Sequence, residues 1–141
     1  MIIVDTNVVS EALRATPDRT VVAWLDAQPA ETLFLTAVSY AELMLGVGRL
    51  PPGRRRTSIA DAVDLVLHEL FDGRILPFDL VAAKAYTGIV VHAQKQGHTL
   101  SIADAQIASI AESLGFKIAT RDKAFKHAGG TVINPWVRPA R

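Results

Sequence analysis

Four carboxylates in this chain occupy positions from which side chains can reach a common site. Asp5 ends the apolar run at residues 2–4, and Asp122 follows a second apolar run near the C-terminus. Glu42 and Asp104 fall in the first turns of two expected helices. Ligand sites in parallel sheets form beyond the carboxyl ends of the strands, so we expect all four acids at the same edge of a sheet.

Such a group of carboxylates suits a hard divalent cation. Negative charges crowded together repel one another unless a cation neutralises them, and oxygen ligands select Mg²⁺ or Mn²⁺. The chain has no cysteine, and its four histidines show no pair at ligand spacing, which argues against a zinc site. Because Mg²⁺ commonly joins protein carboxylates to a substrate phosphate, the predicted reaction is hydrolysis of a phosphate ester by an activated water.

Each acid also has a purely structural interpretation. Asp5 or Asn7 could cap a helix. Ser39-x-x-Glu42 and Ser101-x-x-Asp104 have the form of capping boxes, in which the acid satisfies a backbone N–H. Capping gives no reason for acids from different segments to meet at one edge. The two interpretations are compatible, since a helix N-terminus keeps a nearby carboxylate ionised.

The elements that position these acids alternate between strands and helices. Apolar runs predict strands at residues 1–4, 32–36, 74–78, 116–120 and 132–133, the third of them at an edge because it contains Pro77. Apolar spacing and breaker residues predict helices at 8–13, 17–27, 39–48, 58–71, 79–97 and 101–115. Strands separated by helices imply an α/β fold with a mostly parallel sheet of four to five strands and helices on both faces.

Length and composition are those of an ordinary small domain. The 141 residues suffice for a single domain, 1–141, with a substantial core. Half of the residues are hydrophobic, but no run approaches a membrane-spanning helix. The N-terminus lacks the pattern of a secretory signal, so we expect a cytoplasmic protein. The formal net charge of +1 does not by itself indicate a nucleic-acid binder.

The distribution of charge is more informative than its sum. Arg49 and Arg54-Arg55-Arg56 flank Pro51-Pro52-Gly53 and predict a basic loop between two helices. This loop is either a solvated surface or a set of phosphate contacts, and the second function requires it to lie near the acids. In that case Arg54, Arg55 and Arg121 hold an anionic chain across the site.

The predicted helix at 17–27 has a wide apolar face. Its residues are Val21, Val22, Trp24 and Leu25. The chain has more apolar residues than one small core comfortably hides, and exposed apolar patches mark partner surfaces. We therefore expect this face to contact a partner and the protein to form a homodimer.

Several of these segments together match a known family. The chain resembles PIN-domain ribonucleases, most closely the VapC-type toxins of bacterial toxin–antitoxin pairs and their FitB-like branch. The resemblance lies in the order and spacing of Ile3-Val4-Asp5-Thr6-Asn7, Ala41-Glu42-Leu43 with Gly46, Ala103-Asp104-Ala105-Gln106-Ile107-Ala108, Ala119-Thr120-Arg121-Asp122 and Ile133-Asn134-Pro135-Trp136. It covers nearly the whole chain.

The resemblance implies a PIN-like three-layer sandwich and an Mg²⁺- or Mn²⁺-dependent endoribonuclease. Asp5, Glu42 and Asp104 match the family's metal-binding acids, and Asp122 matches a more variable fourth position. The family often has a further acid just before the phenylalanine of the last acidic motif, where this chain has Ala124.

The resemblance also bears on substrate and partners. It implies an RNA substrate, a homodimer and inhibition by a cognate VapB-like antitoxin, with which a larger hetero-oligomer binds operator DNA. Thr6 and Asn7 match small polar neighbours of the metal ligands. Together with Thr120 and Arg121 they are expected to contact the substrate.

Two other functions remain open on the residues alone. A metal-dependent phosphatase with an aspartyl nucleophile also ends its first strand on an aspartate, but it expects a second aspartate two residues later, where Asn7 stands. A non-catalytic module would use the acids as helix caps and act only through its antitoxin on nucleic acid. Metal-dependent cleavage separates this module from the nuclease.

Overall fold

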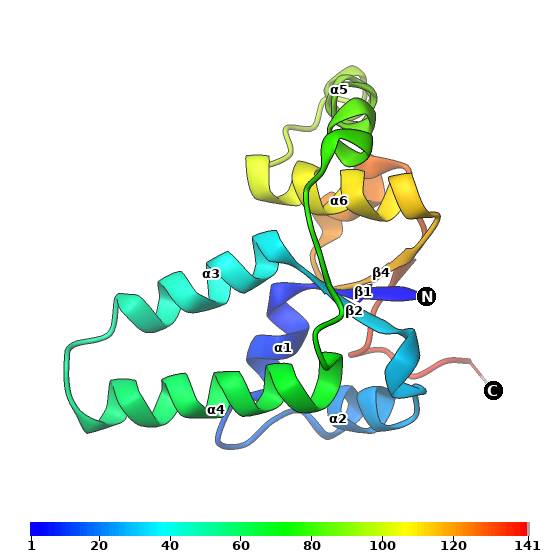
Figure 1. The fold of residues 1–141 in the computed structure, drawn as a ribbon. Helices are drawn as coiled ribbons and strands as arrows, with labels where there is room; N and C mark the ends of the chain where they lie inside the picture. Colours follow the sequence, from blue (N-terminus) through cyan, green and yellow to red (C-terminus); the bar gives the residue numbers. More distant parts are fainter. Residues whose placement is uncertain (141) are drawn as a thin grey trace.

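The computed structural model describes residues 1–140, and a five-stranded sheet lies at its centre (Figure 1). The strand order is β3-β2-β1-β4-β5, and each neighbouring pair is parallel. The strands are β1 (Ile2–Val4), β2 (Leu33–Thr36), β3 (Ile75–Leu76), β4 (Lys117–Ala119) and β5 (Val132–Ile133). The predicted α/β fold with a parallel sheet is confirmed, and β3 lies at an edge as expected.

Helices connect successive strands and cover both faces of the sheet. They are α1 (Thr6–Ala12), α2 (Arg19–Asp26), α3 (Ala37–Gly48), α4 (Arg54–Phe71), α5 (Leu80–Lys95) and α6 (Ile102–Leu114), with the short 3-10 helices η1 (Ala30–Thr32) and η2 (Lys123–Ala128). In Figure 1, α5 and α6 lie on one side of the sheet and α1, α2 and α4 on the other. Within residues 1–140, no helix is long and apolar enough to cross a membrane.

Each face of the sheet has its own hydrophobic core. The alternation of β1 separates them, because Val4 packs into the core under α1, α2, α3 and α4, whereas Ile3 packs into the core under α5, α6 and η2. Both side chains are fully buried. Burial on both faces explains why the first strand is a continuous apolar run rather than an alternating one.

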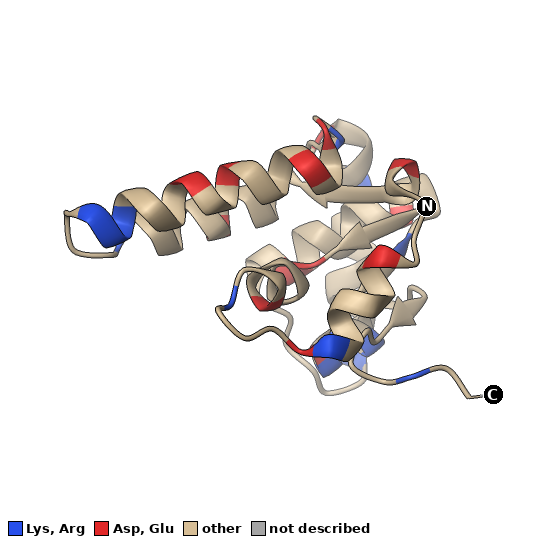
Figure 2. Ribbon diagram, turned by 90° about the horizontal axis from the view of Figure 1, so that it is seen from below, with Lys and Arg blue, Asp and Glu red and all other residues tan. Residues whose placement is uncertain are grey.

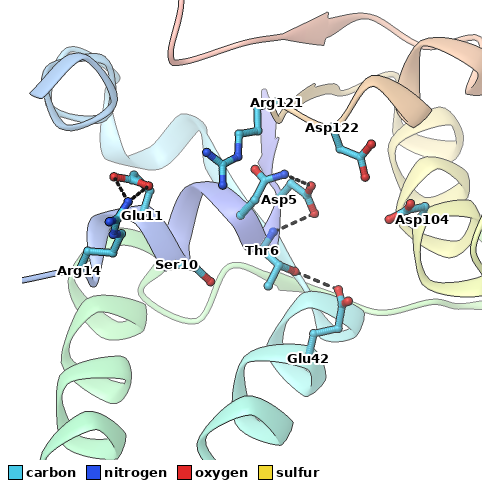
Figure 3. Close-up of a pocket in the computed structure, with 10 residues that line it drawn as sticks. Asp5, Thr6, Ser10, Glu11, Arg14, Glu42, Asp104, Arg121 and Asp122 are labelled. Atoms are coloured by element: carbon cyan, nitrogen blue, oxygen red, sulfur yellow. Dashed lines mark hydrogen bonds and ion pairs between the residues drawn. The ribbon is translucent and has the colours of Figure 1, made fainter. Parts of the chain in front are cut away.

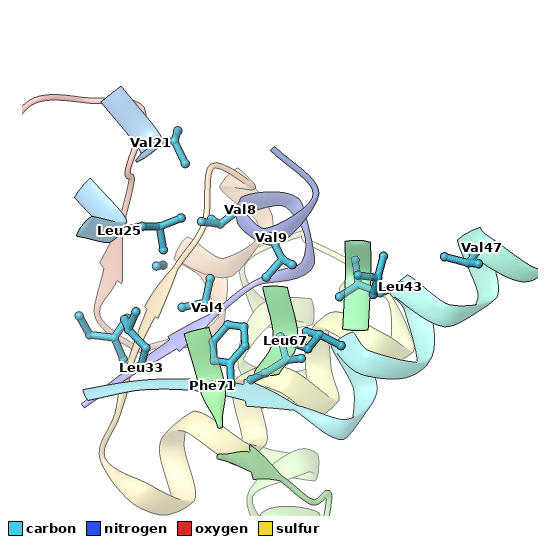
Figure 4. Packing of buried hydrophobic residues seen from close by; sticks show 14 residues of the cluster. Val4, Val8, Val9, Val21, Leu25, Leu33, Leu43, Val47, Leu67 and Phe71 are labelled. Atoms are coloured by element: carbon cyan, nitrogen blue, oxygen red, sulfur yellow. The ribbon is translucent and has the colours of Figure 1, made fainter. Parts of the chain in front are cut away.

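The apolar face of α2 belongs to the first of these cores. Val21 and Leu25 are 0% and 6% exposed and point toward Val8 and the rest of the cluster (Figure 4). Trp24 is partly buried against the same core. The expectation that this face is a free partner surface is therefore wrong, because α2 is needed to cover this side of the sheet.

The predicted basic loop is also wrong, because α4 begins at Arg54 and the three arginines form its first turn. Gly53 is the N-cap with φ of 144°, a backbone conformation that other residues rarely adopt, and arginine is a good helix former. The helices α3 and α4 form a hairpin whose turn projects away from the sheet (Figures 1 and 2). The arginines therefore lie at the outer end of this hairpin.

Candidate active site

All four predicted acids line one open cleft of about 460 Å³ (Figure 3). They come from the end of β1, from α3, from the first turn of α6 and from the segment after β4, as the parallel topology requires. The lining residues are Asp5, Thr6, Asn7, Ser10, Glu11, Arg14, Glu42, Asp104, Arg121 and Asp122.

Asp5 is fixed at the floor of this cleft by three hydrogen bonds. As the N-cap of α1, its Oδ1 accepts from the backbone N–H of Thr6 at 2.8 Å. Its Oδ2 accepts from the hydroxyl of Thr120 at 2.8 Å and from the side-chain amide of Asn7 at 3.0 Å. Thr120 reaches Asp5 because β1 and β4 are neighbours in the sheet. Only 5% of Asp5 is exposed.

Glu42 faces the cleft and is not part of a capping box. The N-cap of α3 is Thr36, whose side chain accepts from the backbone N–H of Ser39 at 3.0 Å. Because α3 starts at Ala37, earlier than predicted, Glu42 lies in its second turn. Its Oε1 accepts from the hydroxyl of Thr6 at 2.9 Å, which ties its carboxylate to the residue after Asp5.

The remaining two acids are positioned by helix starts. Ser101 caps α6 by accepting from the backbone N–H of Asp104 at 3.1 Å, and this leaves the Asp104 carboxylate pointing into the cleft (Figure 3). Asp122 caps η2 by accepting from the backbone N–H of Ala124 at 2.9 Å. Asp122 thus combines a structural cap with a position in the cleft.

Burial and mutual repulsion raise the pKa values of two of these carboxyl groups. Burial raises the pKa of Asp5 to about 6 even though Thr120 donates a hydrogen bond to it, and the charges of Asp104 and Glu42 add to the rise. Burial also raises the pKa of Asp104, with further contributions from the charges of Asp122 and Glu42. Ionised carboxylates in this cleft therefore carry an electrostatic cost that a bound cation would remove.

The donor chemistry of the cleft fits a hard divalent cation. The four carboxylates offer oxygen ligands, and the buried side-chain carbonyl oxygen of Asn7 has no hydrogen-bond partner. No three acidic or histidine side chains within residues 1–140 form a ready-made metal cluster, and Figure 3 shows the carboxylates arranged around the cleft. Oxygen ligands of this kind suit Mg²⁺ or Mn²⁺ rather than softer metals.

The predicted substrate contacts fall into two groups. Thr6, Asn7 and Arg121 line the cleft, whereas Thr120 is buried beneath it and orients Asp5. Arg54 and Arg55 are not among the lining residues. They were expected to border the acids, but α4 carries them to the tip of the α3–α4 hairpin.

Three residues of α1 and its C-terminal end line the cleft although nothing in the sequence singled them out. Glu11 is 4% exposed, and its carboxylate accepts from the backbone N–H of Asp18 at 2.8 Å. The same carboxylate pairs with the guanidinium of Arg14 at 3.3 Å. Ser10 stands beside them on the wall of the cleft (Figure 3). The i, i+3 spacing of Glu11 and Arg14 was the available signal, and it predicts only an ion pair.

Comparisons with known proteins agree on one family. A model described as "PIN domain" matches residues 2–130. The chain is 44% identical to VapC ribonuclease Y4jK of Sinorhizobium fredii over 137 residues, which cover 96% of this chain and 98% of that protein. It is 42% identical to toxin FitB of Neisseria gonorrhoeae over 137 residues, which cover 96% of this chain and 99% of that protein. A solved structure of FitAB bound to an IR36 DNA fragment superposes with a TM-score of 0.92 at 40% identity, covering 99% of both chains.

Proposed function

Because the chain belongs to the PIN-domain family, within the group of VapC and FitB toxins, we propose that it is a metal-dependent endoribonuclease that acts as the toxin of a toxin–antitoxin pair. One observation carries this proposal. Carboxylates from four separate segments line one open cleft at the carboxyl end of the sheet, and two of them have raised pKa values. In an open cleft with this chemistry, a cation that offsets the carboxylate charge favours the approach of a phosphate to the acids.

In this proposal Asp5, Glu42, Asp104 and Asp122 hold Mg²⁺ or Mn²⁺. When bound, the cation lowers the pKa of an attacking water and offsets charge on the phosphate. During hydrolysis a bond forms between the water oxygen and phosphorus, the bond from phosphorus to one ribose oxygen breaks, and that ribose oxygen takes up a proton.

The surrounding polar side chains orient the acids. Thr120 and Asn7 fix both the position and the rotation of the Asp5 carboxylate, and Thr6 holds one oxygen of Glu42. Partners of this kind keep ligands in the productive geometry before the substrate arrives. Arg121, on the rim of the cleft, is placed to receive an anionic oxygen of the RNA backbone.

The two competing functions are less consistent with the contacts. An aspartyl-phosphatase needs an acid two residues after its nucleophile, but Asn7 stands there and donates a hydrogen bond to Asp5. A purely capping role fails for Glu42, which caps no helix. The nuclease accounts for all four acids.

The test is to incubate the purified protein with total RNA in Mg²⁺, in Mn²⁺ or in excess chelator and to map the cut ends. We expect cleavage with either metal and none with chelator. Asp5→Asn protein purified in parallel controls for contaminating ribonucleases. Cleavage in excess chelator would refute the metal mechanism, and absence of cleavage under every condition would favour the non-catalytic module.

We further propose that a VapB-like antitoxin binds this toxin in the cytoplasm and that the complex binds operator DNA. The relatives FitAB and VapBC have been solved as toxin–antitoxin complexes, some of them on DNA. The antitoxin would then keep the nuclease inactive until it is removed.

We also propose that the toxin is a homodimer, with its contact on α3 and α6 rather than on α2. Leu45 of α3 is 52% exposed and lines a shallow apolar groove with Val38 and Gln106. Light scattering should therefore report two chains of 15.2 kDa, and Leu45→Glu should give a monomer. Leu65→Glu, at a 57% exposed position on α4, is the matched control and should remain a dimer. A monomeric wild-type protein at micromolar concentration would contradict the proposal.

A further inference from the structure

The cleft changes character along its length. Asp5, Glu42, Asp104 and Asp122 lie toward one end of it, and Ser10, Arg121 and the ion pair of Arg14 with Glu11 lie toward the other (Figure 3). An RNA strand that reaches the acids brings phosphates on either side of the bond to be cut, and the carboxylates repel those phosphates. The cationic end is therefore the part of the cleft that can hold the neighbouring backbone.

Arg121 is held by an aromatic ring instead of by a carboxylate. Its guanidinium carbon lies 4.7 Å from the centroid of the Trp136 ring. Within residues 1–140 no carboxylate lies within ion-pair distance of Arg121, although Asp5 and Asp122 line the same cleft. A cation–π contact of this kind holds the guanidinium in place without a carboxylate partner for its N–H donors.

Trp136 is itself anchored to the protein. It is partly buried against the core beneath α2, and its backbone N–H donates to the side chain of Asn134 at 3.0 Å. The ring therefore provides a fixed surface for Arg121.

Arg14 provides a second cation on the same side of the cleft. One of its nitrogens lies 3.3 Å from Glu11, and its side chain is still 66% exposed. Glu11 is fixed in turn by the backbone N–H of Asp18. A guanidinium carries five N–H donors. The contact with Glu11 therefore positions Arg14 and leaves other N–H groups available to a phosphate.

We propose that Ser10, Arg14 and Arg121 form a subsite for an internucleotide phosphate of RNA, adjacent to the phosphate at the acids, and that Trp136 is the positioning residue for Arg121. The subsite rests on the proposed function, because it extends the same cleft. A guanidinium group can donate two parallel hydrogen bonds to two oxygens of one phosphate. The exposed hydroxyl of Ser10 adds a donor to those of the two arginines. The subsite holds the backbone and reads no base, so it binds single-stranded RNA with little dependence on sequence.

The first test measures binding without metal. A single-stranded oligoribonucleotide of about six nucleotides is titrated in excess chelator, over a range of salt concentrations. Arg121→Ala and Arg14→Ala should each weaken binding by about tenfold and reduce the slope of log K against log salt by about 0.7, the value for one lost phosphate contact on a single strand. Arg19→Ala, which removes an exposed arginine of α2 outside the cleft, should change neither quantity.

The second test separates positioning from folding at Trp136. Trp136→Phe keeps an aromatic face and should bind within about twofold of wild type, whereas Trp136→Leu should lose about as much affinity as Arg121→Ala. The double variant of Trp136→Leu with Arg121→Ala should bind no more weakly than Arg121→Ala alone, because both changes remove the same contact. Additive losses would overturn the positioning role.

The third test locates the phosphate. Neutral methylphosphonate linkages are placed one at a time along the oligonucleotide, and one position next to the mapped cut should weaken binding by wild type but not by Arg121→Ala. If Arg14→Ala and Arg121→Ala bind RNA with the affinity and salt slope of wild type, the subsite proposal is refuted, even if wild type cleaves RNA in Mg²⁺. If these slopes fall as expected but wild type cleaves no RNA, the subsite stands and the nuclease proposal fails.

Discussion

Asp5→Asn and Asp104→Asn are each expected to lower the rate of RNA cleavage by at least about a hundredfold while the fold remains intact. Asparagine keeps the shape of the side chain but removes one negative charge from the set that holds the cation. The Asp104 carboxylate interacts with the side chain of Ser101, the cap of its own helix, whereas the Asp5 carboxylate accepts three hydrogen bonds that fix the floor of the cleft. The Asp104 variant is therefore the cleaner of the two.

The measurement is single-turnover cleavage of a defined RNA in Mg²⁺ and in Mn²⁺, beside a thermal melt of each variant. Asp61→Asn, which removes an exposed carboxylate on α4 outside the cleft, is the matched control and should cleave at the wild-type rate. Full activity in Asp5→Asn or Asp104→Asn would remove that residue from the site. Loss of activity together with loss of the cooperative melt would point to folding instead.

The second large effect is a loss of metal-free stability as the pH rises. Burial raises the pKa of Asp5 from 3.8 to about 6, so the folded state binds more protons than the unfolded state between these values. Stability contributed by a carboxyl group with a raised pKa is present below the unfolded value and is lost as pH rises through the folded value. A shift of this size corresponds to about 3 kcal/mol, and the raised pKa of Asp104 acts in the same direction.

Denaturant unfolding in excess chelator at about pH 4.5 and about pH 7 measures this effect. The difference between wild type and Asp5→Asn isolates it, because other titrating groups are common to both proteins. We expect Asp5→Asn to lose less stability than wild type between these two pH values, by about 2 kcal/mol, because part of the shift lies below pH 4.5. Any hydrogen bond that the amide loses to Thr120 lowers its stability equally at both pH values and leaves this difference unchanged. Equal pH dependence in the two proteins would show that Asp5 ionises without cost.

Metal addition provides a check on the same electrostatics. Mg²⁺ or Mn²⁺ at pH 7 should raise the melting temperature of wild type, because a ligand that binds only the folded state stabilises it. The rise should be smaller in Asp5→Asn, which offers the cation one charge less.

Local patterns in the sequence determined most of the fold and the acids of the site. The apolar run ending at Asp5 predicted a buried strand with a carboxylate at its end, and Ser101 before an apolar stripe predicted the helix start that carries Asp104. Interactions between residues up to four positions apart fix such features, so they can be predicted from the sequence alone. Helix starts were less well determined, because Thr36 and Ser39 are both good caps and α3 in fact begins after Thr36.

The tertiary structure alone decided which distant side chains meet. Thr120 donates to Asp5 across 115 positions of the chain because β4 lies beside β1. His98 and His127 appear unrelated in the sequence, yet their rings stack with centroids 3.4 Å apart. Strand order and helix packing set such contacts, and neither is encoded in local spacing.

The same distinction explains the two surfaces that the sequence mispredicted. The apolar residues of α2 form the same helical stripe whether they face a partner or a core. In the structure α2 packs against the sheet, so this stripe is part of the hydrophobic core. The arginines after Gly53 are basic in any conformation, but α4 places them at the far end of a hairpin while Arg14 and Arg121 reach the cleft. The sequence determines which residues are apolar or charged, whereas the packing of elements around the sheet decides which surfaces are covered and which charges share a site.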